Sequence, residues 1–280
     1  MRKVINLLKK NKDILIFIMG LAMVCYPIIS NHIESSEQES LIKTYETAVN
    51  ELDDDDKYLE IEKAEKWNEA LYTKQSGLPY GEDLGDYSDI LSIGEEGLIG
   101  SIQIPSISVN MPIYHGTDDK VLSVGAGHLE DTSLPVGGTN THCVLTGHRG
   151  LPSSELFTRL DELQEGDQFF INVLDRTLTY QIDSIQVVYP EILDQNGFPI
   201  VQGEDWVTLM TCTPYGINTQ RLLVSGHRVA DEEINDVQQT IDAIKKKIPS
   251  KREIIFYIIP VVFIILGIVM LVKGRWKKDA

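Results

Sequence analysis

Two long apolar runs near opposite ends of the chain constrain its fold more than any other feature. They are Ile14–Ile29 and Ile254–Val272, and the second holds about nineteen residues without a charge. At about 1.5 Å per helical residue, such a run approaches the roughly 30 Å hydrocarbon thickness of a bilayer. We therefore expect transmembrane helices over 13–30 and 253–272. A cleaved signal peptide is the alternative for the first run, but no small-residue cleavage site follows it, which favours an uncleaved anchor.

Basic residues around the first run indicate how the chain crosses the membrane. Before the run lie Arg2, Lys3, Lys9, Lys10 and Lys12. Lys43 alone follows it closely, and cytoplasmic flanks carry the excess of basic residues. We therefore expect 1–12 and the tail 273–280 in the cytoplasm and the large middle segment outside. This predicts a two-pass protein of the cell membrane, with a basic juxtamembrane segment over 231–252 that contacts the membrane surface.

Charge and cysteine content limit which partners and cofactors the chain can have. The chain has 25 Lys and Arg against 42 Asp and Glu, a net charge of −17, and many basic residues lie at its ends. An outer domain this acidic repels phosphates, so we expect no nucleic-acid partner. With three cysteines, one of them Cys25 in an apolar run, packing and not disulfides must supply the stability. No metal-ligand spacing is seen, and we expect neither metal nor cofactor.

Between the two spans the composition changes once, near residue 97. Residues 31–96 begin with a stretch rich in Glu, Lys, Ala and Leu, which predicts one or two amphipathic helices followed by a lid or linker. Over 97–230, short apolar runs alternate with Gly, Pro, Asn and Asp, a pattern typical of strands joined by turns. Seven or eight strands with few helices between them indicate a mainly β closed barrel or sandwich. The strand candidates are Leu98–Ile104, Ile107–Tyr114, His142–Thr146, Gln168–Leu174, Leu178–Tyr189, Trp206–Thr211 and Arg221–Ser225.

Three side chains at strand ends could provide the groups that covalent catalysis needs. Cys212 closes one strand-like run before a turn, His148 closes another, and Arg221 begins the strand after the turn. If the runs on either side of the turn form a hairpin, Cys212 and Arg221 face each other. A thiolate, a proton carrier and a cation for a developing oxyanion then lie together. Taken singly, the three also have structural readings: a buried small side chain, a turn residue and the partner of a carboxylate.

The motifs around these residues resemble the sortase signature, in the order His, Cys, Arg. Its parts here are Thr146-Gly-His148-Arg149-Gly150, Thr208-Leu-Met-Thr-Cys212 and Asn218-Thr-Gln-Arg221-Leu-Leu-Val. Other segments across 97–230 resemble the class C, pilus-assembling sortases, as do the two membrane anchors. Among them are Leu98-Ile-Gly-Ser-Ile-Gln-Ile-Pro105, Gly125-Ala-Gly-His-Leu129 and Thr213-Pro-Tyr-Gly-Ile-Asn218.

The resemblance implies an eight-stranded sortase-type β-barrel over 97–230 and a cysteine transpeptidase with thiol-protease chemistry on the outer face of a Gram-positive cell. In that family the thiolate cleaves an LPXTG-like sorting signal of a pilin or surface protein between Thr and Gly. An amine, typically a pilin lysine, then resolves the thioacyl enzyme, and pili are assembled. Two alternatives are attachment of proteins to cell-wall peptide and a non-catalytic membrane-anchored scaffold that binds the same signals.

The same resemblance assigns roles to the catalytic candidates and their neighbours. Cys212 becomes the nucleophile, His148 the proton donor to the leaving amine, and Arg221 the substrate clamp and oxyanion stabiliser. Thr211 and Thr213, on either side of the nucleophile, are expected to bind the substrate.

Two further residues, His128 and Cys143, have weaker signals. His128 is expected to bind substrate by shaping the cleft, and the alternative is a plain loop residue. Cys143, in the middle of a predicted strand, is expected to be buried, with a regulatory disulfide to the nucleophile as the alternative.

A possible lid precedes the barrel. Class C relatives usually carry an Asp-Pro-aromatic motif there that covers the catalytic cysteine. The corresponding residues here are Leu78, Pro79 and Tyr80, so the Asp is replaced by Leu78. Tyr80 is the candidate cap over the thiol. A flexible linker is the alternative, because glycines on both sides favour mobility.

Overall fold

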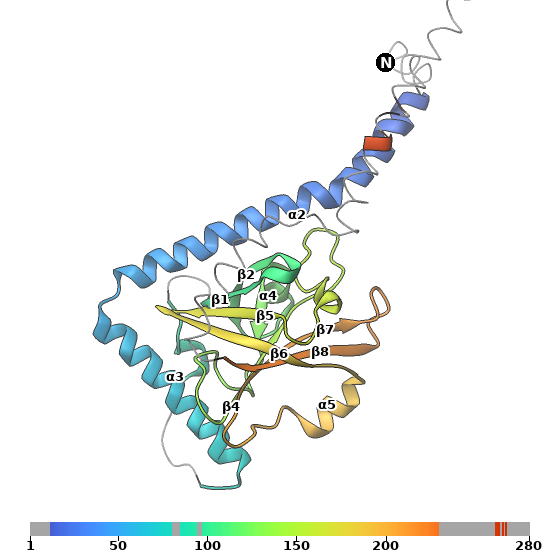
Figure 1. Ribbon diagram of the computed structural model, residues 1–280. Helices are drawn as coiled ribbons and strands as arrows, with labels where there is room; N and C mark the ends of the chain where they lie inside the picture. The colour runs from blue at the N-terminus through green and yellow to red at the C-terminus, as the bar shows by residue number, and fades with distance from the viewer. Residues whose placement is uncertain are drawn as a thin grey trace, which may run out of the picture. The chain divides into compact units, whose positions relative to one another are not determined.

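A computed structural model describes residues 12–79, 85–93, 97–229, 261–263, 265 and 267 (Figure 1). The chain divides into two compact units, Met1–Ile33 with Lys246–Ala280, and Glu34–Lys245.

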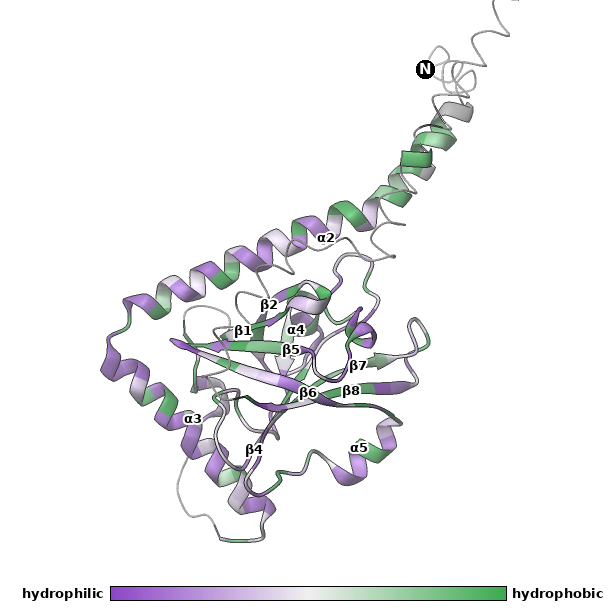
Figure 2. Cartoon of the chain, viewed as in Figure 1, coloured by the Kyte–Doolittle hydropathy of each residue, from purple (hydrophilic) through white to green (hydrophobic). Residues whose placement is uncertain are grey.

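The first predicted span lies in a helix of 40 residues, α2 (Lys12–Glu51). Its N-terminal part is strongly apolar (Figure 2). Within the described chain it is the one helix long and apolar enough to cross a membrane, as an anchor or as a signal sequence. The second predicted span, 253–272, lies mostly outside the described residues, with 261–263 helical. The two-pass topology therefore stays a prediction, as do the segments 1–11, 231–252 and 273–280, which lie outside the described residues.

The helices expected before the barrel are the C-terminal part of α2 and a second helix, α3 (Asp54–Gln75). Asp53 caps α3 by accepting a hydrogen bond from the Asp56 amide at 2.8 Å, and three acidic residues fill its first turn. Negative charge there complements the positive end of the helix dipole, which gives the acidic run a structural role. Tyr45 holds α2 against the barrel, because its hydroxyl donates to the Ile99 carbonyl at 3.0 Å.

Eight strands close into a barrel in the order β1-β2-β3-β4-β7-β8-β6-β5. They are β1 (Leu98–Ile104), β2 (Val109–His115), β3 (Ala126–His128), β4 (Thr141–Thr146), β5 (Gln168–Val173), β6 (Arg176–Val188), β7 (Asp205–Thr213) and β8 (Gln220–Arg228). The pairs β2–β3 and β4–β7 are parallel and the other pairs are antiparallel. The predicted mainly β barrel with N-terminal helices is confirmed.

Short elements fill the connections between the strands. They are the 3-10 turns η1 (Tyr87–Asp89), η2 (Pro105–Ile107) and η3 (Leu160–Glu162), and the helices α4 (Asp119–Val124) and α5 (Pro190–Asn196). The sequence pattern indicated neither α5 nor β3, because one or two turns of helix and three strand residues are too short to show a period.

Alternation along β7 separates the core from the outer face of the barrel. Val207, Leu209 and Thr211 are buried, and of the intervening residues Met210 and Cys212 are half-buried, whereas Thr208 is buried against His142. Because successive strand residues point to opposite faces, Cys212 lies on the outer face together with Met210.

Candidate active site

The parallel pairing of β4 with β7 brings His148 to Cys212. Thr146 is opposite Met210, and the Gly147 amide donates to the Met210 carbonyl at 3.1 Å. The chain therefore continues alongside β7 after β4 ends. His148 and Cys212 each lie two residues beyond the Thr146–Met210 pair, at the same end of the barrel.

The hairpin of β7 and β8 brings Arg221 to the same place. Cys212 and Arg221 are directly opposite in the antiparallel register, as the sequence predicted. The Arg221 guanidinium donates to the carbonyls of Gln220 at 3.3 Å and Asn218 at 3.5 Å. It forms no ion pair within the described part of the chain, so its charge is not neutralised by a carboxylate there. The strand register thus places Cys212, His148 and Arg221 at one end of the barrel.

Arg149 is a residue of this rim that the sequence reasoning missed. Its buried guanidinium donates to the Thr213 hydroxyl at 3.0 Å and forms an ion pair with Asp161. The side chain therefore links the segment that carries His148 to the end of the strand that carries Cys212. The signal in the sequence that could have pointed to Arg149 is its place directly after His148, within the family motif.

Gly147 and Phe157 fix the backbone beside His148. A Cβ on Gly147 would lie 2.7 Å from Cδ2 of Phe157, which is closer than real Cβ contacts come. Phe157 is fully buried, and its amide donates to the His148 carbonyl at 3.2 Å. Glycine at this position is what allows the ring to pack directly under the histidine loop.

Two of the three expected substrate-binding residues are buried instead. Thr211 is 1% exposed, and its hydroxyl donates to the Gly147 carbonyl at 2.8 Å. This bond ties β7 to the histidine loop, so the buried Thr211 positions that loop, and the substrate contact expected from the sequence stays a prediction. Thr213, the third, is half-buried and accepts the hydrogen bond from Arg149.

His128 is 0% exposed and belongs to β3, so its side chain is not open to a substrate in this structure. Its Nε2 lies 2.8 Å from the Ser133 carbonyl, which only accepts, and Nε2 therefore carries the proton. Its Nδ1 accepts from the Tyr87 hydroxyl at 2.6 Å. Burial lowers the pKa of His128 to about 4, so the ring is neutral at physiological pH. Its role is to anchor the segment that leads into the barrel.

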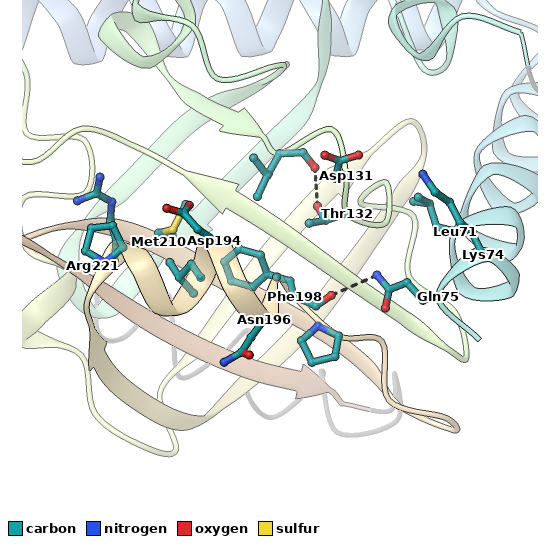
Figure 3. Close-up of a pocket in the computed structure, with 15 residues that line it drawn as sticks. Leu71, Lys74, Gln75, Asp131, Thr132, Asp194, Asn196, Phe198, Met210 and Arg221 are labelled. Carbon is teal, nitrogen blue, oxygen red and sulfur yellow. Dashed lines mark hydrogen bonds between the residues drawn. The ribbon is translucent and has the colours of Figure 1, made fainter. Parts of the chain in front are cut away.

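A groove of about 720 Å³ runs over the outer face to Arg221 (Figure 3). Four segments line it: the end of α3, the β3–β4 loop, α5 with the loop that follows, and the ends of β7 and β8. Its apolar lining includes Leu71, Leu129, Leu193, Phe198 and Met210. Its charged lining includes Lys74, Asp131, Asp194 and Arg221. A groove that combines apolar side chains with a cation suits an extended peptide whose carbonyl is to be polarised.

The remaining expectations concern Cys143 and the lid. Cys143 is 3% exposed and pairs with the core residue Val207, and burial raises the pKa of its thiol well above the usual range. It faces the core while Cys212 faces outward, so a disulfide between them does not fit this fold. Leu78 and Pro79 are exposed and do not line the groove, and Tyr80 lies outside the described residues. A lid therefore stays a prediction.

Comparisons with known proteins show which family this chain resembles. The sortase domain family matches residues 102–229. A solved structure of sortase C1 from Streptococcus agalactiae is 45% identical, covers 69% of this chain and 99% of its own, and superposes with a TM-score of 0.63. Sortase C from Clostridium perfringens with the C-terminal cell wall sorting motif is 43% identical over 68% of this chain and 98% of its own, with a TM-score of 0.60. Sortase A of Streptococcus agalactiae is 29% identical over 174 residues, which cover 56% of this chain and 68% of that protein. This chain therefore belongs to the sortase family of cysteine transpeptidases, as its sequence motifs predicted.

Proposed function

We propose that this chain is a membrane-anchored, pilus-assembling sortase that cleaves an LPXTG-like sorting signal between Thr and Gly and transfers the acyl group to a pilin lysine. The observation that carries the proposal is the strand register that brings Cys212, His148 and Arg221 to one end of the barrel, where Arg221 also lines the groove. The likeness to class C sortases supports the same reading.

In the first half-reaction the Cys212 thiolate attacks the carbonyl carbon of the signal's threonine. A C–S bond forms, and the carbonyl electron pair moves to the oxygen, where the Arg221 guanidinium stabilises the negative charge. Collapse of this intermediate breaks the Thr–Gly C–N bond. The protonated His148 gives its proton to the glycine nitrogen, which leaves as an amine. A thioester on Cys212 remains.

In the second half-reaction the acceptor amine attacks the thioester carbon and gives up a proton to the now neutral His148. The C–S bond breaks, and the thiolate is regenerated. Attachment to a cell-wall peptide amine uses the same steps, so the acceptor decides between the two fates. The net charge of −17 favours a cationic acceptor surface, such as one rich in lysine.

Intact mass spectrometry tests the proposal. The full chain in detergent is incubated with an LPXTG peptide, first alone and then with a lysine-containing pilin peptide. We expect a thioacyl adduct that the amine discharges faster than water does. Cys212→Ala should give no adduct, whereas Cys143→Ala, which alters a buried thiol on β4 that faces the core, should keep the acyl step nearly intact.

Two results would contradict the proposal. An adduct that persists in Cys212→Ala would place the nucleophile elsewhere. Wild-type protein whose thiol reacts with a small alkylating agent, but not with the peptide, would remove the sorting signal as its substrate.

A further inference from the structure

Helix α3 holds both walls of the groove through two amide side chains. Asn68 donates to the Leu134 carbonyl at 3.1 Å and accepts from the Leu134 amide at 2.7 Å. Gln75 donates to the Phe198 carbonyl at 3.4 Å and accepts from the Ile200 amide at 2.9 Å (Figure 3). Seven residues make about two helical turns, so both amides lie on one face of α3. One contacts the β3–β4 loop and the other the loop after α5.

A residue of the barrel also contacts the loop after α5. The Nδ1 of His142 lies 2.9 Å from the Pro199 carbonyl, and its Nε2 lies 2.8 Å from the Thr208 hydroxyl. A carbonyl only accepts, so Nδ1 carries the proton. Burial lowers the pKa of His142, and in the neutral ring Nε2 accepts from the Thr208 hydroxyl. The Thr208 oxygen in turn is 2.8 Å from the Ser225 hydroxyl, which donates to it. The direction of every bond in this chain is thus fixed by the neutral imidazole.

Residues 198–200 are therefore tied at three successive positions, although they belong to no helix or strand. Such a segment lacks the hydrogen-bond ladder of a sheet, and side chains must satisfy its backbone groups instead. Phe198 and Pro199 line the groove, as does Gln75 itself, so these bonds set the position of that wall. Gln75 and His142 approach the segment from different elements.

We propose that Gln75 and His142 are positioning residues that hold segment 198–200 as a fixed groove wall, and that α3 thereby sets the affinity for the sorting signal without taking part in the chemistry. The inference rests on the proposed function, since it assigns the groove to the peptide. It predicts an effect on KM that is separate from kcat, because a loosened wall must be reordered before the peptide binds.

The test compares variants of the full chain in detergent, with an LPXTG peptide at saturating amine. Gln75→Met keeps the length of the side chain and removes both bonds. We expect it to raise KM about 5- to 10-fold, consistent with the loss of two ordinary hydrogen bonds, with kcat within about twofold. Alkylation of Cys212 by iodoacetamide should keep its wild-type rate, and hydrogen exchange at the Ile200 amide should quicken.

Two further variants serve as rescue and control. Gln75→Glu retains an acceptor for the Ile200 amide and should raise KM less than Gln75→Met does. Gln181→Ala removes a comparable bond, from a glutamine to the Gly166 carbonyl at 3.2 Å, on β6. It should leave KM unchanged.

Each outcome decides between the two proposals. An active wild type whose KM and Ile200 exchange are unaltered by Gln75→Met would overturn this inference alone. A fall in kcat and alkylation rate, together with a lowered melting temperature, would also overturn it, because α3 would then act on global stability. A wild type inert toward the peptide would overturn the proposed function, and this inference with it.

Discussion

At the scale of single residues, the guanidinium of Arg221 should matter for its shape as well as its charge. Arg221→Lys keeps the positive charge but replaces a planar fork of donors with a single ammonium group. Loss of one oxyanion donor typically slows an acyl transfer by about 10² to 10³, and we expect at least a tenfold fall in the rate of thioacylation. The side chain is on the rim and only half-buried, so the melting temperature should change by less than about 2 °C.

Single-turnover mass spectrometry and thermal unfolding together check this prediction. Arg176→Lys is the matched control, because Arg176 pairs with Glu65 at 3.3 Å on an exposed surface. A slowed reaction matched by an equal loss of stability, or no slowing at all, would remove Arg221 from the reaction.

At the scale of elements, the loop after β4 must approach Phe157 closely. In Gly147→Ala the new methyl group meets a fully buried ring that has little room to move. Overpacking of this kind costs about 1–3 kcal/mol, and it displaces His148 as well. We expect lower stability in urea unfolding and a lower kcat. Adding Phe157→Leu should recover part of the lost stability and part of the lost kcat. If the effects of the two substitutions are strictly additive, the two residues are not coupled.

The sequence predicts contacts between neighbouring segments better than contacts between segments that are far apart in the chain. Alternating apolar residues around a turn predicted the β7–β8 hairpin, so Cys212 could be paired with Arg221. The position of His148 beside the end of β7, the strand of Cys212, depends on the parallel pairing of β4 with β7. No local sequence pattern encodes which strands become neighbours. For that contact the family motif supplied the prediction.

The sequence did not predict the groove, because four separate segments form it. The family resemblance led us to expect His128 and Thr211 at the substrate. Strand alternation turns Thr211 into the barrel, and pairing within the three-residue β3 buries His128.

At the scale of the whole molecule, buried neutral histidines should make the fold sensitive to acid. Burial lowers the pKa of His115 and His142, and that of His128 to about 4. An unfolded histidine titrates near 6.5, so between about pH 6.5 and 4 the unfolded state binds more protons and stability falls as the pH drops. Asp205, whose pKa burial raises, acts in the opposite direction over the acidic range.

For His128 alone, these values correspond to a loss of about 2 kcal/mol of unfolding free energy between pH 7.5 and pH 5. His128→Gln can still donate to the Ser133 carbonyl but does not titrate. It should be less stable than wild type at pH 7.5, because the Tyr87 hydroxyl loses its nitrogen acceptor, yet it should lose less on acidification. Urea unfolding of the full chain in detergent at pH 7.5, 6 and 5 measures both slopes. Equal slopes for the two proteins would mean that His128 is protonated in the folded state at pH 5, and that the Tyr87 contact does not depend on a neutral ring.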